Sequence, residues 1–543
     1  MADTTPDPSG TDPFAAMLEA QARWTQMMFA PLTQPPTAGE DAAPLPTADL
    51  QKWAQNATRL QTMWLEFCQT NAIEATNEMM AGDPAEWPAK WFAMFETWTQ
   101  QLPFADPAEQ QRWWAESVQL WQALLVAPGD SQDAAGGDAE LPRKDRRFAD
   151  PRWREQPIFA LIHQTYLLLT ERVLAMVEKM DTVEPGKREQ LKFATQAMAE
   201  ALSPANFAAT NPIVLDRIME TRGESLVKGM QNLLQDLQKG QLTHSDPQAF
   251  TVGEDIAATP GQVVFETPLY QLIQYEPTTE KVLSVPLVIF PPWINRFYIL
   301  DLNEKKSFVK WALDQGLTVF MVSWKSADSS MKDIVWDDYI AAQIEAIDHV
   351  RKRLRQPHVH AIGYCVAGTT LAATLALLAA REEADKVKSA TFFTAQIDFT
   401  DAGDLLHFVD DQQIAAIQGL KRDGYLDGRF MAATFNLLRG NDLIWNYVVR
   451  NYLLGEDHTA FDLLHWNGDV TNLPAKWHRD YLQDLYRDNL LVKPGRLQAL
   501  GTPIDLRKVE VPTYVQAGKD DHIAPASSVW KITEHFRGPL RFV

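Results

Sequence analysis

The arrangement of hydrophobic and polar positions changes near residue 245. Before it, apolar residues recur every three or four positions, which is typical of amphipathic helices, most clearly in residues 51–80, 87–102 and 157–177. After it, short apolar runs alternate with helical stretches. These runs are the predicted strands, at 285–290, 317–324, 359–365, 387–395, 511–518 and 540–543. Short apolar strands separated by helices predict a parallel sheet with helices on both faces.

With 543 residues the chain is too long for one hydrophobic core. We predict three parts. Residues 1–144 form an acidic, tryptophan-rich extension of helices and linkers, residues 145–245 a helical N-terminal domain, and residues 246–543 an α/β catalytic domain. Residues from about 396 to 500 interrupt the strand–helix alternation of the last part. They are expected to form a cap over the carboxyl edge of the sheet.

The helices predicted at 51–80 and 87–102 carry stripes of Trp, Met and Phe. Such a stripe is usually the buried face of a helical bundle. It can also be an amphipathic surface that docks on a partner or on an apolar particle. The sequence leaves both interpretations open.

Composition excludes several classes of function. A formal charge of −21 argues against nucleic-acid binding and against attraction to an anionic membrane. Two cysteines, Cys68 and Cys365, cannot form a disulfide framework, and no Cys/His cluster suggests zinc. The N-terminus has no basic and apolar signal pattern, so a reducing cytoplasm is expected. The uncharged run 359–380 could span a bilayer, but its glycines and turn-like centre favour strand, turn and helix.

The stretch HAIGYCVAGTTL, residues 360–371, places Cys365 on a small-residue turn between a predicted strand and a predicted helix. The nucleophile elbow of α/β-hydrolases, G-x-S-x-G, has this form, with Ala367 here in place of the last glycine. In that position the helix N-terminus is expected to lower the pKa of the thiol, and the Val366 N–H to face a developing oxyanion. The alternative is a buried structural cysteine.

A nucleophile of this kind needs a second oxyanion donor and an acid. The rigid turn Pro291–Asn295 follows the strand at 285–290 and could hold a backbone N–H in place. After the strand at 511–518, either Asp520 or Asp521 could orient a histidine. Both aspartates could instead serve turn formation and helix capping.

Six motifs together resemble the polyhydroxyalkanoate synthase family, in its class I form. The motifs are GYCVAGTTLA, PPWINRFYILDL, SWKSADSSMKDIVWDDYI, AQIDFTDAGDL, LLHWNGDVTNLPAKWH and GKDDHIAP. The segment DRRFADPRWREQPIFALIHQTYLL resembles the start of the family's N-terminal domain. The resemblance runs from about Asp145 to Val543.

The resemblance implies an α/β-hydrolase fold with a cap subdomain, preceded by a mainly helical domain. It implies a cytoplasmic homodimer that polymerises (R)-3-hydroxyacyl-CoA into a polyester and releases CoA. Motif spellings resemble the class that acts on short acyl chains, such as 3-hydroxybutyryl-CoA. No cofactor is expected, because CoA is part of the substrate. The expected partners are the polyester granule surface and phasin-type granule proteins.

The family pattern also implies roles for single residues. Cys365 is the nucleophile that carries the acyl chain as a thioester, and Asp521 is the triad acid. Val366 and Ile294 offer their backbone N–H groups to the oxyanion. Trp466 matches an invariant family position in the cap, where packing or a dimer contact is expected.

The base is the missing member of this set. In the hydrolase order it follows the acid in the chain, and the family places it in a Gly-x-Gly-His-type loop after the last strand. The sequence ends at Val543 without that loop, so a C-terminal truncation is predicted. His522 and His535 alone follow Asp521; the first is expected to point away from the thiol, and the second to be a surface or packing residue.

Two other functions stay open at this point. One is a cysteine-type α/β-hydrolase or thioesterase that transfers the acyl group to water. The other is an inactive scaffold that binds granules or dimerises with an intact synthase, as the absent triad histidine suggests. The long cap and the apolar N-terminal helices favour exclusion of water, and therefore transfer over hydrolysis.

Overall fold

The computed structural model describes residues 49, 51–63, 145–180, 184–409, 411–419 and 423–543. The chain forms two compact units, one of Met1–Leu242 with Arg439–Asp457 and one of Thr243–Leu438 with His458–Val543. The predicted three-part division stays a prediction. Of the predicted helix 51–80, residues 51–63 are helical; its remainder and the helix predicted at 87–102 lie outside the described residues.

The described part of the first unit is helical, as the three- and four-residue periodicity predicts. Three of its helices begin with proline at the first position, where the missing N–H costs nothing. The Asn211 side chain caps one of them by accepting from the N–H groups of Ile213 and Val214. The main helices are α6 (Pro157–Glu178), α7 (Pro185–Ala201), α8 (Pro212–Thr221) and α9 (Glu224–Lys239), with π-helical segments at Asn441–Trp445 and Val448–Leu453.

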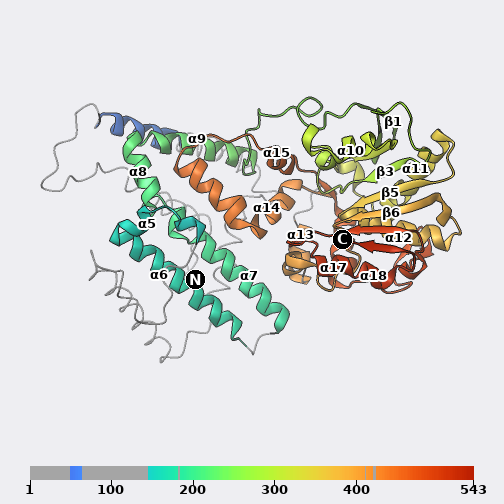
Figure 1. Cartoon of the computed structure of the whole chain (residues 1–543). Coiled ribbons are helices and arrows are strands. Elements are labelled where there is room, and N and C mark those ends of the chain that lie inside the picture. The colour runs from blue at the N-terminus through green and yellow to red at the C-terminus, as the bar shows by residue number, and fades with distance from the viewer. Residues whose placement is uncertain (1–48, 50, 64–144, 181–183, 410, 420–422) are drawn as a thin grey trace, which may run out of the picture. The chain divides into compact units, whose positions relative to one another are not determined.

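The second unit is built on an eight-stranded sheet in the order β1-β2-β4-β3-β5-β6-β11-β12 (Figure 1). The six predicted strands are confirmed and run parallel, but β1 and β2 add an antiparallel edge that the sequence patterning missed. The sheet is therefore mixed. The strands are β1 (Gly261–Glu266), β2 (Tyr270–Tyr275), β3 (Leu287–Phe290), β4 (Val319–Trp324), β5 (Val359–Tyr364), β6 (Val387–Phe393), β11 (Thr513–Gln516) and β12 (Leu540–Phe542).

Both faces of this sheet are covered, as predicted. In β3, Val288 and Phe290 join the core cluster that includes α11 and α12, whereas Leu287 and Ile289 join the cluster that includes α10. Successive side chains of a strand point to opposite faces, so a fully apolar strand needs apolar cover on both. The helices that pack against this sheet are α10 (Phe308–Asp314), α11 (Trp336–Leu354), α12 (Val366–Ala380), α17 (Ala526–Trp530) and α18 (Ile532–His535).

Between β6 and β11 the second unit has short helices and two small two-stranded sheets instead of regular alternation. Residues 439–457, inside the predicted cap range, belong to the first unit. The described elements of the second unit in this region are α13 (Asp411–Gly419), β7 (Tyr425–Leu426), α14 (Gly428–Leu438), α15 (Asp462–Gly468), β8 (Leu473–Pro474), α16 (Ala475–Asp480), a π-helix (Tyr481–Arg487), β9 (Gln498–Ala499) and β10 (Thr502–Pro503).

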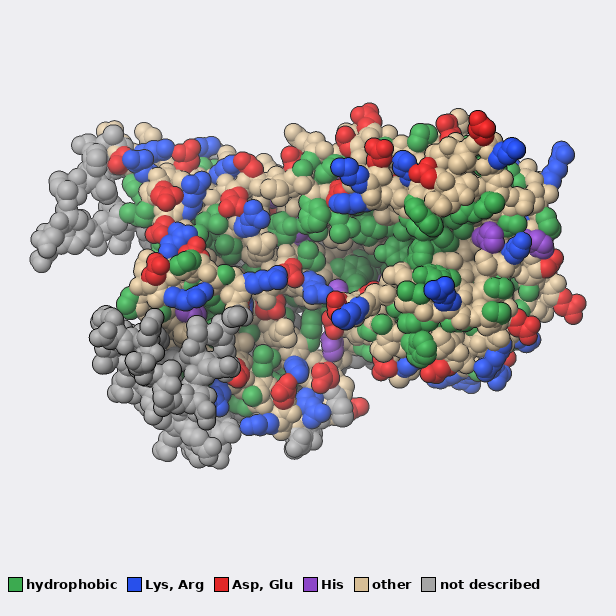
Figure 2. Space-filling model, in the orientation of Figure 1, with side chains coloured by type: hydrophobic (Ala, Val, Ile, Leu, Met, Phe, Trp, Pro, Cys, Tyr) green, Lys and Arg blue, Asp and Glu red, His purple; other side chains and the backbone are tan. Residues whose placement is uncertain are grey.

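The apolar run 359–380 is strand β5, a turn and helix α12, as predicted. None of the helices in the described ranges is long and apolar enough to cross a membrane. On the face seen in Figure 2, the described acidic and basic side chains are interspersed instead of gathered by sign.

Candidate functional site

Cys365 occupies the sharp turn between β5 and α12 with a strained backbone. Its φ of 53° and ψ of −130° place a non-glycine residue at positive φ, which costs about 1–3 kcal/mol. Hydrogen bonds hold this conformation. The Cys365 N–H donates to the Phe393 carbonyl at 2.9 Å, and the Cys365 carbonyl accepts from Gly368 N–H at 2.8 Å and Thr369 N–H at 3.1 Å. The turn therefore has the strained strand-to-helix geometry of a nucleophile elbow.

Two glycines allow the helix to leave the strand so abruptly. A Cβ atom added to Gly363 would lie 2.5 Å from the Gly368 Cα, and one added to Gly368 would lie 2.8 Å from the Gly363 carbonyl oxygen. Gly368 thus supplies the close approach, and Ala367 is a fully buried helical residue. Ala367 is not among the described residues with positive φ, so its methyl group is tolerated there.

The thiol of Cys365 is less acidic than predicted. Burial raises its pKa to about 11. The Val366 N–H donates to the sulfur and lowers the pKa by a smaller amount, while the Asp521 charge raises it further. The helix N-terminus does lower the thiol pKa through the Val366 N–H, as predicted, but desolvation outweighs this effect and the net shift is upward.

A measurable consequence is slow, strongly pH-dependent alkylation of Cys365. With a pKa of about 11, the thiolate fraction at pH 8 is roughly a thousandth. The rate of modification by iodoacetamide should rise about tenfold per pH unit from pH 7 to 10. Peptide mass spectrometry measures this rate, with a free cysteine peptide as the reference. A rate that levels off below pH 8 would contradict the raised pKa.

Asp521 lies in the turn that follows β11, and its charge acts on residues of the elbow. Its Oδ1 accepts hydrogen bonds from the N–H groups of Ile523 and Ala524, both at 2.9 Å. These two bonds fix the side chain. The Asp521 charge acts on both Cys365 and Tyr364, whose pKa values it helps to raise after burial. The structure thus brings the predicted nucleophile and the predicted acid together.

Two tyrosines beside Cys365 were missed by the sequence analysis. Burial raises the pKa of Tyr481 and of Tyr486 well above the ordinary range, and the charge of Cys365 adds to both shifts. The two hydroxyls are hydrogen-bonded to each other, and Tyr486 also accepts from the Gln396 amide at 3.1 Å. Five residues apart, they lie about 140° apart on an α-helix. The π-helix that begins at Tyr481 brings them together instead.

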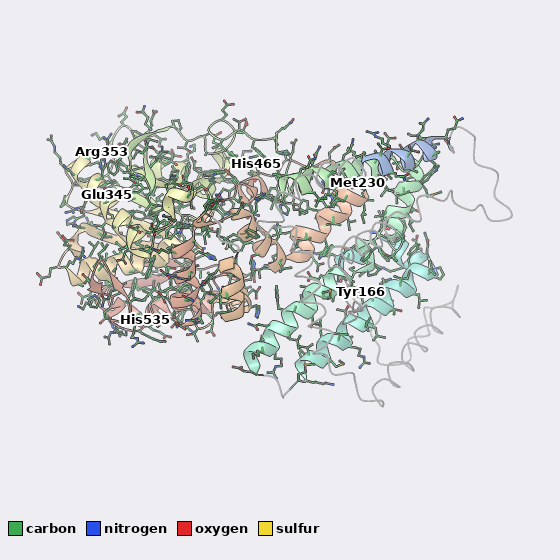
Figure 3. All side chains as sticks on the ribbon, turned by 180° about the vertical axis from the view of Figure 1, so that it is seen from behind. Tyr166, Met230, Glu345, Arg353, His465 and His535 are labelled. Carbon is green, nitrogen blue, oxygen red and sulfur yellow. The ribbon has the colours of Figure 1, made fainter. Side chains whose placement is uncertain are left out.

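The influences that shift the Cys365 pKa are burial, the Val366 N–H and the Asp521 charge, and none of them is a histidine. His535, at the end of α18 (Figure 3), has its Nε2 3.7 Å from the Asp398 carboxylate. Burial alone would raise the pKa of Asp398, but the nearby His535 ring and the hydrogen bonds from Thr400 and Asn489 hold it below its ordinary value. The His522 carbonyl accepts from the Asp404 N–H. The base stays unassigned, and no described group of His, Cys, Asp and Glu is arranged to hold a metal ion.

Ile294 lies in the turn after β3, near the elbow along the same sheet edge. In the parallel pairing of β3 with β5, Phe290 faces Gly363, two residues before Cys365. The two chain segments therefore leave neighbouring strands at the same end. Trp466, on α15, donates its indole N–H to the Arg296 carbonyl at 2.9 Å. This contact ties Trp466 to the turn that carries Ile294, and its predicted dimer contact stays a prediction.

A mostly parallel sheet with a strained cysteine elbow and an aspartate after a late strand defines an enzyme of the α/β-hydrolase fold. Residues 286–543 match the α/β-hydrolase fold family model. Residues 144–312 match the model described as the N-terminus of poly-beta-hydroxybutyrate polymerase (PhaC). Among solved structures, a hydrolase from Pseudomonas aeruginosa PA01 is 16% identical over 52% of this chain and 89% of its own, with a TM-score of 0.29.

Curated relatives define the family. The poly(3-hydroxyalkanoate) polymerase of Methylorubrum extorquens is 46% identical over 79% of this chain and 70% of its own. The PhaC subunits of Rhizobium meliloti (strain 1021) and Cupriavidus necator (strain H16) are 45% and 42% identical, over 76% and 80% of this chain and 68% and 73% of theirs. The chain belongs to the poly(3-hydroxyalkanoate) polymerase family of acyltransferases. The comparisons do not test the predicted C-terminal truncation.

Proposed function

We propose that the chain polymerises short (R)-3-hydroxyacyl-CoA, such as 3-hydroxybutyryl-CoA, through a thioester on Cys365. The observation that carries this proposal is the strained cysteine at the β5–α12 turn, with the Val366 N–H directed at its sulfur. Strain of this kind concentrates at functional sites, because a structural cysteine gains nothing from it. Membership of the polymerase family supplies the substrate class.

In the proposed reaction, the sulfur of Cys365 attacks the carbonyl carbon of the acyl-CoA. The oxyanion that forms accepts from the N–H groups of Val366 and Ile294. Its collapse breaks the carbon–sulfur bond to CoA, which leaves with the thiol proton, and the acyl group stays on Cys365. The 3-hydroxyl oxygen of another hydroxyacyl unit then attacks the thioester carbonyl on Cys365. The new ester bond forms as the carbon–sulfur bond to Cys365 breaks, and the hydroxyl proton returns to the sulfur. Because the thiol is protonated at neutral pH, this sequence needs a general base.

The surroundings of the thiol favour transfer to a hydroxyl over hydrolysis. Tyr486 is buried and Cys365 and Tyr481 are half-buried, so this part of the site has limited contact with bulk water. The ring of Tyr481 stacks on Trp477 with centroids 5.0 Å apart, and Tyr486 packs against Phe399 at 4.7 Å. An apolar aromatic wall protects a thioester from water.

Incubation of the purified chain with (R)-3-hydroxybutyryl-CoA tests the proposal. We expect release of free CoA together with an insoluble polyester, and slower release from (R)-3-hydroxydecanoyl-CoA. CoA release with soluble 3-hydroxybutyrate alone would identify a thioesterase. Binding to polyester granules without any CoA release would identify a scaffold. Equal rates with both substrates would refute the preference for short chains.

The family also suggests where the chain acts. We place it in the cytoplasm at the surface of the polyester granule, as a homodimer beside phasin-type proteins. The supporting argument is chemical, because an insoluble product stays attached to the enzyme that extends it. Sedimentation of the chain with granules, and its mass in solution, test the two parts of this assignment separately.

A further inference from the structure

The turn that carries Ile294 is held by a threonine from the cap region. The hydroxyl of Thr471 shares its one proton between the carbonyl oxygens of Trp293, at 2.7 Å, and of Ile294, at 2.6 Å. Thr471 is buried, so water does not compete for these two acceptors. A single side chain 177 residues further along the chain than Ile294 thus fixes two successive peptide groups of the turn.

The planarity of the peptide bond gives this contact a consequence for Ile294. The carbonyl of Trp293 and the N–H of Ile294 belong to one trans peptide group, so they point in opposite directions. The bond from Thr471 to the Trp293 carbonyl therefore sets the direction of the Ile294 N–H. Among the described residues, no backbone carbonyl accepts a hydrogen bond from that N–H. It is available to a ligand.

Other contacts hold the same turn from the same cap segment, residues 466–471. The Asp469 carboxylate accepts from Arg296 Nε at 3.0 Å and from the Tyr298 hydroxyl at 2.8 Å. A β-bridge joins Asn295 to Val470. The Trp466 indole bond to the Arg296 carbonyl completes the set. Of these cap residues, Thr471 is the one whose side chain bonds to the peptide group that contains the Ile294 N–H.

Thr471 is in turn anchored to the sheet through its neighbour Asn472. The Asn472 N–H donates to the Ser326 hydroxyl at 2.9 Å, and its side-chain amide donates to the Ala327 carbonyl at 3.1 Å. Ser326 and Ala327 lie just after β4, beyond Lys325. On the other side of the turn, the ring of Trp293 stacks on Tyr339 with centroids 3.9 Å apart. The peptide group between Trp293 and Ile294 is therefore fixed from both sides.

We propose that Thr471 is a positioning residue of the acyl-transfer site. It aims the Ile294 N–H at the oxyanion that forms when Cys365 attacks an acyl-CoA. The cap segment thereby completes the oxyanion-binding site of the sheet domain. The inference rests on the proposed function of Cys365, and it adds a residue that touches neither the nucleophile nor the substrate.

The test compares two reactions of the same thiol at pH 9, where thiolate is more abundant. Acylation by (R)-3-hydroxybutyryl-CoA, followed in a single turnover by intact mass, passes through an oxyanion. Alkylation by iodoacetamide forms a sulfur–carbon bond as iodide leaves, and no oxyanion develops. In Thr471→Val we expect acylation to slow by about tenfold to a hundredfold, since loss of a whole oxyanion donor costs 10²–10³. Alkylation should stay at the wild-type rate.

Thr471→Ser is the matched control, because it keeps the hydroxyl and should acylate within about threefold of wild type. Equal acylation by wild type and Thr471→Val overturns the inference. So does a slowing of acylation and alkylation by the same factor, which indicates a purely structural role. A wild-type chain that is alkylated but never acylated at Cys365 overturns the proposed function and this inference with it.

If Thr471→Val does not fold, Trp466→Phe decides the question. This change removes the indole donor to the Arg296 carbonyl, two residues after Ile294, and keeps a smaller aromatic ring. We expect acylation to slow by about threefold while alkylation is unchanged. Unchanged acylation in Trp466→Phe counts against positioning of the turn by the cap segment.

Discussion

Replacement of Cys365 by alanine is expected to abolish covalent acylation of the chain by (R)-3-hydroxybutyryl-CoA. The thioester needs the sulfur, and an alanine methyl group has no nucleophilic electron pair. Cys365→Ala keeps the Cβ atom and the positive φ of the turn, so the fold should be unaffected. Intact-mass measurement after mixing with excess substrate gives the acylated fraction directly. CoA release should fall at least about 10³-fold.

The chain supplies its own control for this experiment. The sequence has one other cysteine, Cys68, so Cys68→Ala removes a thiol and leaves the sequence of the elbow unchanged. Cys68→Ala should be acylated as fully as the wild type. An adduct that persists in Cys365→Ala, or one that disappears in Cys68→Ala, would refute the assignment of the nucleophile.

Replacement of Gly368 by valine is expected to unfold or severely destabilise the second unit. A Cβ atom at this position would meet the Gly363 carbonyl oxygen at 2.8 Å and would collide with the Cβ atom of Ala395. Neither neighbour is the flexible end of a side chain, so relief requires α12 to move off β5. We expect a loss of about 3 kcal/mol or more in the free energy of unfolding. Soluble yield and the urea midpoint measure the loss.

Gly419, at the end of α13, provides the matched substitution. A Cβ atom there meets nothing within 4 Å among the described residues. Gly419→Val should therefore change stability by no more than about 0.5 kcal/mol. A similar loss of stability in both variants would show that close packing at the elbow is not the cause.

The elbow was predictable because its structure is local. Residues 359–380 contain an apolar strand, a turn of small residues and an alanine- and leucine-rich helix in succession. The local sequence of each part predicts its secondary structure. The location of Asp521 after β11 was predictable for a different reason, because the carboxyl ends of parallel strands meet at one edge of a sheet. Its role as the triad acid stays a prediction. The antiparallel edge was missed because β1 is mostly exposed and has no clear alternation.

The pKa of Cys365 shows a limit of sequence reasoning. The helix that follows Cys365 is visible in the sequence, and it suggests an acidic thiol. Desolvation of the sulfur raises its pKa instead. This desolvation depends on residues far along the chain, including Tyr481 and Tyr486, which come close to Cys365 only in the folded unit. Their five-residue spacing gives no common face unless the segment is a π-helix.

By itself, the sequence determined the alternation of strands and helices, the cysteine turn and the family, because these depend on neighbouring residues and on motif order. The tertiary structure alone decided how the site is assembled. It partly buried the thiol of Cys365 and raised its pKa, and it placed Thr471 against the peptide group that joins Trp293 to Ile294. Such contacts join residues more than a hundred positions apart, and their geometry is set by the packing of the whole unit.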